Sequence, residues 1–424
     1  MAGHAVTSVS SPARHPAVVV ALDCITGLQT ARILAARGVP VTGVAADPRH
    51  YCARTRAVRR VVASPTAGEP LIATLERIGP QVGDPARGGP AFLVPCSDTS
   101  VLSISAARER LSPWFRFVLP AHDLVERLVD KIGFTELAQA NGLAIPPTRI
   151  LRSRADAEAA ASTLAYPVVM KPGLKTARWQ AATKAKVFRV DDAAGLLETY
   201  DRCAAWTDSL IAQTWVDGAE TDLYTSNLYF DRTSQPQVTF ITRKLRQWPI
   251  ETGTGCLGVE ARNDAVLEES IRFFRSVDYQ GLGYLEMKRD ARTGAHYIIE
   301  PNIGRPTGRS ATAERAGVEL LMTAYRDAFE EPLPEARTQR YEGVKWIYWR
   351  RDLQSSLVAM RHGELSLLAW WRSIRGPRVE AVGSWRDPLP FMLDAWRIAG
   401  RIGRRVRPGR PSRPTAPDPA RGKA

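Results

Sequence analysis

The fold is decided by two neighbouring stretches, G-Y-L-E-M-K-R at residues 283–289 and A-H-Y-I-I-E-P at residues 295–301. The turn-forming pair Thr-Gly occupies residues 293–294 between them, and this pattern predicts a β-hairpin. A tip at this position places Glu286 directly opposite Glu300 on the neighbouring strand. Two like charges in such a pair repel each other and destabilise the hairpin.

A divalent cation bound between the two glutamates would offset this repulsion and give the pair a function. Alternation along the strands places Lys288 on the face of Glu286, and Ile298 on the face of Glu300. Asn302 follows two residues beyond Glu300 and would add an amide oxygen on the same side. Two carboxylates and a carbonyl oxygen suit a hard cation such as Mg²⁺. On the hairpin alone, a solvated face neutralised by nearby Arg and Lys is the simpler interpretation.

The composition is that of ordinary globular protein, with an uneven distribution of charge. The chain has 424 residues, 44% of them hydrophobic and 24% charged, which is enough for two or three domains. Of the net charge of +14, residues 1–335 carry +2, residues 336–400 carry +5 and residues 401–424 carry +7. The basic character therefore belongs to a C-terminal appendage.

The cysteines and apolar runs indicate the compartment. The five cysteines are scattered and never form a C-x-x-C pair, which argues against a disulfide framework or a zinc site. The apolar run at residues 17–22 is too short for a signal peptide, and no stretch approaches the ~20 apolar residues of a membrane span. We therefore expect a soluble, cytoplasmic protein.

Residues 17–120 have the pattern of an open α/β domain. Continuous apolar runs at 17–22, 41–45 and 91–95 predict buried parallel strands, and a helix is expected at 28–37. The loop after the first strand is D-C-I-T-G-L and not G-x-G-x-x-G, which favours a tight turn over a dinucleotide site.

Further boundaries follow from the remaining patterns. Asp98 follows the strand at 91–95, and we interpret it as the cap of a helix at 99–110 in preference to a ligand contact. Residues 130–141 and 267–277 are expected to be helices, and residues 173–185 a long polar loop. Strands are expected at 167–172, 186–190, 210–216, 221–230 and 238–244. The expected divisions are a disordered N-terminus at 1–16, domains at 17–120 and 121–335, a Trp/Arg-rich region at 336–400 and a disordered basic tail at 401–424.

Three lysines and the edge of one strand add further candidate ligand-binding groups to those of the hairpin. Lys131 stands at a helix start, where free N–H groups favour anions, Lys171 ends an apolar strand, and Lys244 is a third candidate phosphate cation. The edge of the strand at 210–216 could bind a purine through its backbone, and Glu220 could accept ribose hydroxyls. Each signal is weak alone, but their order and spacing are specific.

These motifs resemble those of the ATP-grasp superfamily. They run in the family's order as D-K-x-x-F-x-x-L-A-x-x-N-G-L-x-x-P (130–146), V-V-M-K-P (168–172), I-A-Q-T-W-V-D-G-x-E (211–220), Y-L-E-M-K (284–288) and I-I-E-P-N (298–302). The chain is most similar to the D-aspartate ligase-like carboxylate–amine ligases. D-alanine–D-alanine ligase, biotin carboxylase and carbamoyl-phosphate synthetase are more distant. The resemblance implies a mixed α/β and α+β fold, with an N-terminal open α/β (pre-ATP-grasp) domain, a two-lobed ATP-grasp domain and a C-terminal helical extension with a basic tail.

The resemblance also implies roles for individual residues. ATP and Mg²⁺ or Mn²⁺, with two ions, are the expected cofactors. Lys131, Lys171 and Lys244 would contact the phosphates, and Gln213, Thr214, Trp215 and Val216 would bind adenine, mainly through the backbone. Glu220 would hold the ribose, and Glu286, Glu300 and Asn302 would bind the metal. Arg305 or Arg309 would hold the substrate carboxylate or the oxyanion.

Three positions depart from the family's pattern. The loop at 173–185 carries Lys175, Arg178 and Lys184 where many members have glycines. In N-I-G-R, Arg305 comes one residue later than the family's arginine, which weakens the inference of a transition-state role. Gln213 replaces a frequent Glu, which matters little if the backbone binds the purine.

The implied reaction is the activation of a carboxylate as an acyl phosphate, followed by attack of an amine and release of ADP and phosphate. A carboxylase or carbamoyl-phosphate-type enzyme that uses carboxyphosphate is the alternative enzyme. The alternative that is not an enzyme is a non-catalytic ATP-binding regulator with a membrane tether. The six histidines show no metal-ligand spacing, and no Ser/His/Asp or Cys/His arrangement is apparent.

The sequence of the C-terminal region does not decide which partner the region binds. Six of the eleven tryptophans lie between Trp346 and Trp396, interleaved with arginine. A small helical domain with a solvated basic tail is the favoured interpretation. Peripheral docking of the tail on an anionic inner-membrane surface comes second, and nucleic-acid binding last, because RNA-recognition motifs are absent. Small-molecule substrates are expected, and a homodimer is compatible with the sequence.

Overall fold

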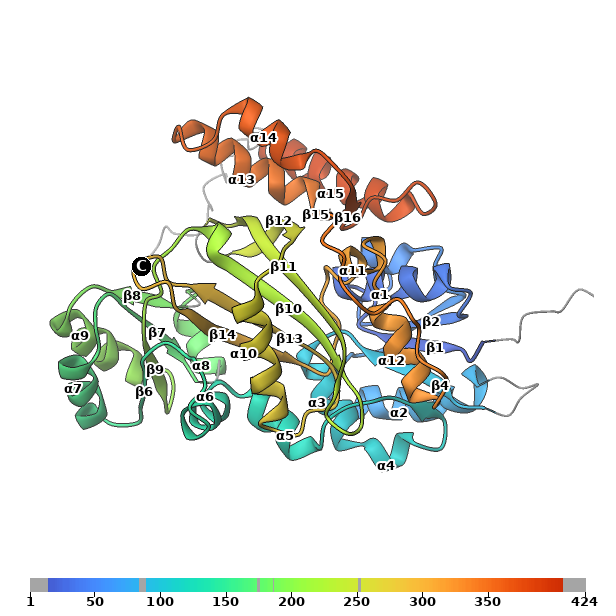
Figure 1. Ribbon diagram of the computed structural model, residues 1–424, viewed down its shortest axis with the longest axis horizontal. Helices are drawn as coiled ribbons and strands as arrows, with labels where there is room; N and C mark the ends of the chain where they lie inside the picture. Colours follow the sequence, from blue (N-terminus) through green and yellow to red (C-terminus); the bar gives the residue numbers. More distant parts are fainter. Residues whose placement is uncertain (1–13, 84–88, 174–175, 186, 251–252, 407–424) are drawn as a thin grey trace, which may run out of the picture.

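The computed structural model describes residues 14–83, 89–173, 176–185, 187–250 and 253–406, with side chains up to Arg397. The prediction of a disordered N-terminus and tail therefore concerns residues that lie for the most part outside the described ranges. Three sheets form the body of the molecule, and a group of C-terminal helices lies at one end (Figure 1).

The first sheet is parallel and has the strand order β3-β2-β1-β4-β5. Its strands are β1 (Ala17–Val20), β2 (Val41–Ala45), β3 (Arg60–Ala63), β4 (Ala91–Pro95) and β5 (Phe115–Arg116). The accompanying helices are α1 (Ile25–Ala36), α2 (Gly68–Val82), α3 (Asp98–Ala106) and α4 (Arg108–Leu111). Every residue of β1, β2 and β4 is buried, as their continuous apolar runs predicted.

Two local predictions in this sheet need correction. The first strand ends at Val20 and not at residue 22, because Ala21 has a φ of 63° and turns the chain out of the strand. The helix expected at 99–110 is divided at Ala107 into α3 and α4. The order of the strands reverses between β1 and β4, which places the loops after these two strands at the edge where open sheets bind ligands.

The second sheet is antiparallel, has the order β6-β9-β7-β8 and forms a small lobe with its own core. Its strands are β6 (Thr148–Leu151), β7 (Val168–Pro172), β8 (Phe188–Val190) and β9 (Leu210–Thr214). Helices α7 (Arg154–Thr163) and α9 (Ala193–Ala204) pack against each other in this lobe. Helices α5 (His122–Val129) and α6 (Lys131–Ala140) connect it to the first sheet.

The loop expected at residues 173–185 contains a short helix, α8 (Ala177–Ala182). The Oγ1 of Thr176 accepts a hydrogen bond from the N–H of Trp179 and so caps the helix. The indole of Trp179 is buried and packs against Phe188 and Trp206. The polar composition of the segment concealed this single aromatic anchor.

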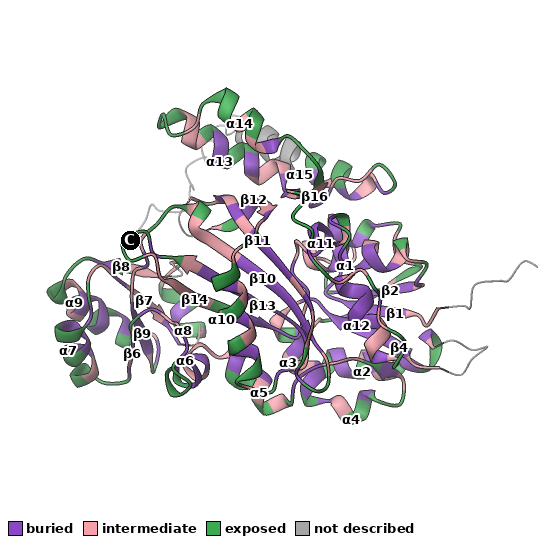
Figure 2. Ribbon diagram, in the orientation of Figure 1, coloured by how far each residue is buried: buried purple, intermediate pink, exposed green. Residues whose placement is uncertain are grey.

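The third sheet has seven strands in the order β14-β13-β10-β11-β12-β15-β16. They are β10 (Leu223–Phe230), β11 (Pro236–Trp248), β12 (Thr254–Glu260), β13 (Gly281–Arg289), β14 (His296–Ile303), β15 (Lys345–Ile347) and β16 (Arg378–Glu380). Short helix η2 (Glu220–Asp222) precedes the sheet, and α10 (Asp264–Arg275), α11 (Ala311–Arg315) and α12 (Leu320–Ala328) accompany it. The interior strands β10, β11 and β13 are largely buried (Figure 2).

Residues beyond the third sheet form the helices α13 (Trp349–Arg361), α14 (Leu367–Ile374) and α15 (Leu389–Val406). They lie together at the top of Figure 1, and α13 packs on β11 and β12. Helix α15 contacts the short helix η1 (Tyr51–Arg54). Among the described residues, no helix combines the length and apolar character needed to cross a bilayer.

Candidate nucleotide and metal site

A cavity of about 450 Å³ lies between the small lobe and the seven-stranded sheet. Its lining comes from both sides, since β7 and β9 contribute from the lobe and β11, β13 and β14 from the sheet. The predicted site residues that line it are Lys131, Lys171, Gln213, Thr214, Trp215, Val216, Lys244, Glu286 and Glu300. The structure thus brings together nine residues that are up to 169 positions apart in the sequence.

The acidic pair has the register that the hairpin pattern predicted. Glu286 pairs directly with Glu300, and Tyr284 pairs with Asn302. A bulge follows Glu286, so that Met287 pairs with Ile298. The prediction that Ile298 shares the face of Glu300 is wrong, because the bulge turns Ile298 into the core, where it is fully buried.

The two carboxylates differ in their electrostatic environment. Burial alone would raise the pKa of Glu286, but the charges of Lys244 and Arg309 lower it overall. Desolvation in the cavity and the charge of Glu286 raise the pKa of Glu300, against the attraction of Lys131 and Lys171. The pair therefore contains one carboxylate that the protein stabilises as an anion and one that lacks sufficient positive charge.

Three lysines surround the acidic pair, each from a different element. Lys131 is the first residue of α6, whose N-terminus is capped by Asp130. The Nζ of Lys171 on β7 donates to the Oε1 of Gln213 at 3.3 Å, and the Nζ of Lys244 on β11 donates to the Oε1 of Gln247 at 3.0 Å. Desolvation lowers the pKa of Lys171 and of Lys244. Both ammonium groups thus lack a full counter-charge, which an anionic ligand would supply.

The strand edge expected to bind a purine is only partly available. The N–H of Thr214 donates to the carbonyl of Pro147, and that of Trp215 donates to the carbonyl of Pro167, both at 2.9 Å. Within the described part of the chain, the N–H of Val216 has no acceptor. Val216, which lines the cavity, therefore offers a free backbone donor at this edge within the described chain.

Lys288 is a cavity residue to which the sequence motifs assigned no role. Its Nζ donates to the carbonyl of Val216 at 2.8 Å and lies 5.2 Å from the centre of the Trp215 ring. It therefore fixes Val216, whose N–H is the free donor, and its neighbour Trp215. Its alternation with Glu286 on β13 was the signal that could have identified it.

Glu220 lies in the short helix η2, outside the cavity lining. Its Oε2 accepts a hydrogen bond from the backbone N–H of Gln247 at 3.0 Å, and Gln247 itself lines the cavity. Glu220 thereby connects η2 to the end of β11 that carries Lys244. Its predicted contact with ribose stays a prediction.

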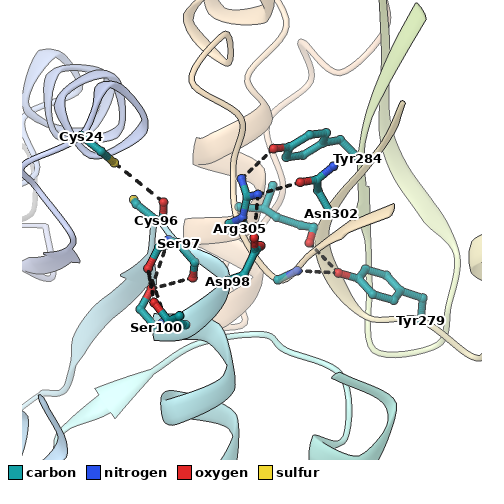
Figure 3. Close-up of polar contacts among 12 residues, drawn as sticks. Cys24, Cys96, Ser97, Asp98, Ser100, Tyr279, Tyr284, Asn302 and Arg305 are labelled. Atoms are coloured by element: carbon teal, nitrogen blue, oxygen red, sulfur yellow. Dashed lines mark hydrogen bonds and ion pairs between the residues drawn. The ribbon is translucent and has the colours of Figure 1, made fainter. Parts of the chain in front are cut away.

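Arg305 is held by three side chains from three parts of the chain (Figure 3). Its Nε donates to the Oδ1 of Asp98, its Nη1 to the hydroxyl of Tyr284, and its Nη2 to the Oδ1 of Asn302, each at 2.6 Å. Gly304, with a φ of 68°, turns the chain immediately before it. The guanidinium is thus fixed beside the end of the hairpin that carries Glu300.

The interpretation of Asp98 as a helix cap is wrong. Ser97 caps α3 through a reciprocal arrangement with Ser100, and this leaves the carboxylate of Asp98 free to bind Arg305 (Figure 3). Asp98 follows β4 in the first sheet, whereas Arg305 follows β14 in the third. The ion pair therefore joins the N-terminal domain to the edge of the site.

Arg309 and the loop lysines occupy different surroundings. The Nη2 of Arg309 donates to the Oγ1 of Thr225 at 3.1 Å and to the Oε1 of Glu286 at 3.3 Å, so it holds the metal-ligand candidate directly. In the loop, Arg178 pairs with Asp208, and Lys184 is exposed. Lys175 lies outside the described residues.

The donor set fits a hard cation that also binds phosphate oxygens. Among the described residues, no group of three or more His, Cys, Asp or Glu side chains is placed to hold a metal. Glu286 and Glu300 supply two carboxylates, and the Oδ1 of Asn302 already accepts from Arg305. Mg²⁺ usually takes one or two carboxylates from the protein and completes its shell with phosphates and water.

Comparisons with known proteins find relatives among ligases. No protein-family model matches the chain. The chain is 23% identical over 270 residues to a D-aspartate ligase of Enterococcus faecium, and the match covers 61% of this chain and 63% of the ligase. It is 25% identical over 186 residues to a D-alanine–D-alanine ligase of Xanthomonas axonopodis pv. citri, covering 41% and 55% of the two chains. The chain thus spans less than two thirds of the length of these relatives.

Solved structures share the fold at low sequence identity. An N5-carboxyaminoimidazole synthetase from Staphylococcus aureus superposes with a TM-score of 0.59 at 14% identity, covering 76% of this chain and 80% of that one. An L-amino acid ligase from Bacillus licheniformis superposes with a TM-score of 0.56 at 18% identity, covering 78% of each chain. The arrangement of a small lobe against a large sheet is therefore the fold that these enzymes share.

Proposed function

We propose that the chain is a member of the ATP-grasp superfamily, and that it is an ATP- and magnesium-dependent ligase that joins a carboxylate to an amine. The single observation that carries the proposal is the pairing of Glu286 with Glu300 in a cavity also lined by Lys131, Lys171 and Lys244. An acidic pair ringed by lysines suits a polyphosphate and its metal, since the protein then balances both charges.

ATP is the ligand that the cavity fits. A volume of about 450 Å³ lies within the range of small-molecule sites. The N–H of Val216 would donate to the purine, and Lys131, Lys171 and Lys244 would contact the phosphates. Glu286 and Glu300 would hold Mg²⁺, whose positive charge lowers the barrier to transfer of the γ-phosphoryl group. We propose that two such ions are bound with ATP, as the resemblance to ATP-grasp enzymes implies.

The chemistry requires an activated carboxylate, because an oxide ion is a poor leaving group at neutral pH. The carboxylate oxygen bonds to the γ-phosphorus, the bond from the γ-phosphorus to the β,γ-bridging oxygen breaks, and ADP leaves. The amine then attacks the acyl carbon, phosphate leaves with the electron pair of the acyl–oxygen bond, and the amine proton passes to solvent. The lysines neutralise the transferring phosphoryl group.

Arg305 is the candidate for holding the second partner of the reaction. Its side chain stands at the junction of the N-terminal sheet with the hairpin, and its pKa is raised by Tyr284 and Asp98, against desolvation. A guanidinium fixed in this way can orient a substrate carboxylate or stabilise the tetrahedral oxyanion. Arg309 acts on Glu286 and is a positioning residue in this proposal.

A screen of carboxylates against amines tests the proposal, with ADP release as the readout and mass spectrometry to identify the product. ADP and phosphate should form only with the correct carboxylate, and hydroxylamine should intercept the acyl phosphate as a hydroxamate when the amine is left out. AMP and pyrophosphate as products would refute the mechanism. Turnover that depends on bicarbonate alone would favour the alternative of an enzyme that uses carboxyphosphate. ATP binding without any turnover would favour the alternative of a non-catalytic regulator.

A further inference from the structure

The C-terminal helices expose an unusual amount of apolar surface. Ten large hydrophobic residues are exposed in the described part of the chain, and all except Tyr341 lie between residues 353 and 396. We call this set the C-terminal surface, and it comprises Leu353, Leu357, Leu367, Leu368, Trp371, Trp385, Phe391, Met392 and Trp396. Leu367 is 69% exposed, Trp396 is 78% exposed, and Trp385 is fully exposed. Large apolar side chains that are exposed and concentrated in one segment of the chain indicate an interaction site.

The helices that carry this surface are firmly attached through their other faces. On α13, Asp352 is fully buried and accepts hydrogen bonds from the Nε of Arg246 at 2.8 Å and the Nε1 of Trp370 at 3.0 Å. On α15, Asp394 is buried against Tyr348 and Arg350. Except for Trp385, which lies in a turn, the exposed apolar groups therefore belong to helices that are held by contacts on another face (Figure 2).

Helical geometry separates the two faces of α15. Successive residues are turned by about 100° around a helix axis, so Met392 and Trp396 point away from the side that buries Asp394. The same geometry places Leu367 and Trp371 of α14 one turn apart on one side. Each helix is thus amphipathic, with its apolar outer face left without a partner in the described chain.

The exposed charge on this segment is almost entirely positive. Between residues 349 and 397 the exposed basic residues are Arg361, Arg372, Arg375, Arg378, Arg386 and Arg397. Glu364 is the only acidic residue of this segment that is exposed, since Asp352, Asp387 and Asp394 are buried in internal contacts and Glu380 is half-buried. The sequence then adds eight basic residues and one acidic residue at 401–424. The net charge calculated from the sequence thus understates how positive this surface is.

We propose that the C-terminal surface docks on the surface of a lipid bilayer that contains anionic phospholipids. Tryptophan and arginine suit the boundary between headgroups and acyl chains, and the exposed Leu and Met side chains would be buried just below it. The exposed arginines complement anionic headgroups. The protein lies on the bilayer and does not cross it, in keeping with the absence of a spanning helix among the described residues.

Two other occupants fit the observations less well. In a symmetric dimer formed through this surface, the same exposed arginines would face each other and repel, with one exposed Glu to offset them. A nucleic acid would use the arginines and tryptophans but would leave Leu353, Leu367 and Leu368 without apolar partners. An anionic bilayer satisfies both the charge and the aliphatic side chains.

Sedimentation with vesicles tests the proposal on the full chain. One set of vesicles is pure phosphatidylcholine, and the other is an equimolar mixture of phosphatidylcholine and phosphatidylglycerol. The protein should bind the mixed vesicles and not the neutral ones, and salt at about 1 M, where the Debye length is ~3 Å, should weaken binding. The double variant Leu367→Gln/Leu368→Gln should lower the partition coefficient by about tenfold.

The charge contribution has a matched control. Arg361→Gln/Arg372→Gln removes two exposed arginines of the C-terminal surface and should lower partitioning by about tenfold. Arg77→Gln/Arg127→Gln changes the net charge equally on α2 and α5 and should leave partitioning unchanged. Tyr341→Gln removes the exposed hydrophobic residue outside the surface and should likewise have no effect.

Several results would overturn the proposal. If the leucine variant binds as tightly as the wild type, the tail alone carries binding and the helices do not dock. If the wild type ignores mixed vesicles but binds single-stranded RNA, and the leucine variant loses that binding, the partner is a nucleic acid. If the wild type elutes as a dimer that the leucine variant dissociates, the surface is an interface between copies. Circular dichroism of each variant confirms that its helices are intact.

Discussion

Neutralising the two paired glutamates one at a time should change stability in opposite directions while removing the same activity. Lys244 and Arg309 lower the pKa of Glu286, whereas desolvation by the cavity walls and the charge of Glu286 raise the pKa of Glu300. Glu286→Gln therefore removes an anion that the fold stabilises, and Glu300→Gln removes one that the fold repels. A purely structural role for the pair would not predict opposite signs.

The expected magnitudes follow from the contacts. Glu286→Gln weakens a charged hydrogen bond of 3.3 Å to Arg309 and leaves Lys244 without its nearest anion, at a cost of about 1.5 kcal/mol. Glu300 is exposed to the solvent of the cavity, so screening limits the gain on neutralising it to about 0.5 kcal/mol. The apparent unfolding midpoint should fall by about 4 °C in the first variant and rise by about 1 °C in the second.

The pH dependence has opposite signs as well. The lowered pKa of Glu286 adds stability above the ordinary Glu value of about 4.3, and this stability is lost as the pH falls through the lower folded-state value. The raised pKa of Glu300 costs stability once the pH exceeds the folded-state value, and costs nothing below about 4.3. The gain from Glu300→Gln should therefore be present at pH 7 and absent at pH 4.

Thermal unfolding with and without Mg²⁺ and a non-hydrolysable ATP analogue completes the assay. The ligand should raise the midpoint of the wild type and raise that of either variant much less, because binding energy adds directly to stability. ADP release should fall at least a hundredfold in both. The reasoning fails if Glu300→Gln destabilises the free protein by more than 1 kcal/mol, or if either variant keeps a wild-type response to Mg²⁺ and nucleotide.

Three further predictions concern the surroundings of the site. Asp98→Asn should lower kcat/KM more than tenfold with little change in midpoint, because Ser97 still caps α3, whereas Ser97→Ala should cost about 1 kcal/mol of stability and spare activity. Asp352→Asn should cost about 3 kcal/mol, since it leaves Arg246 buried without a counter-charge, and Glu364→Gln on the exposed side should cost nothing measurable. Desolvation lowers the pKa of Lys171 and Lys244, so both lysines should lose their charge at a pH below the ordinary lysine pKa of about 10.4. Nucleotide affinity, measured by calorimetry, should therefore fall as the pH rises toward that value.

The parts of the site that could be predicted are those that depend on neighbours in the sequence. The register of Glu286 with Glu300 followed from the position of one turn, and the structure confirms it. The same local argument placed Ile298 wrongly, because a bulge leaves no mark in an alternating pattern of apolar residues. Residues 254–260 were missed as a strand, since Gly255 and Gly258 interrupt the pattern of β12.

Contacts between distant segments were out of reach for a different reason. Asp98 and Arg305 are 207 positions apart, and each has a sufficient local explanation when taken alone. An Asp after a strand is an ordinary cap candidate, so the simpler hypothesis was preferred until the position of Ser97 excluded it. The positive charge of the C-terminal surface was underestimated from the sequence, because the count included aspartates that the fold buries.

The displaced arginine shows how the chain can depart from a motif and keep its chemistry. Counting positions in N-I-G-R weakened the inference of a transition-state role for Arg305, because this arginine comes one residue later than the family's. The count assumes an extended backbone, but Gly304 has a φ of 68°, which few other residues adopt. The turn at Gly304 brings the guanidinium back to within 2.6 Å of the side chain of Asn302, three residues earlier. Gly304→Ala would strain this turn, and its Cβ would lie 2.7 Å from the side chains of Leu119 and Val101. If the turn is what places Arg305, this change should lower kcat/KM as strongly as Arg305→Lys. An unchanged rate in Gly304→Ala would mean that the turn does not place Arg305, and an unchanged rate in Arg305→Lys would mean that Arg305 has no part in the reaction.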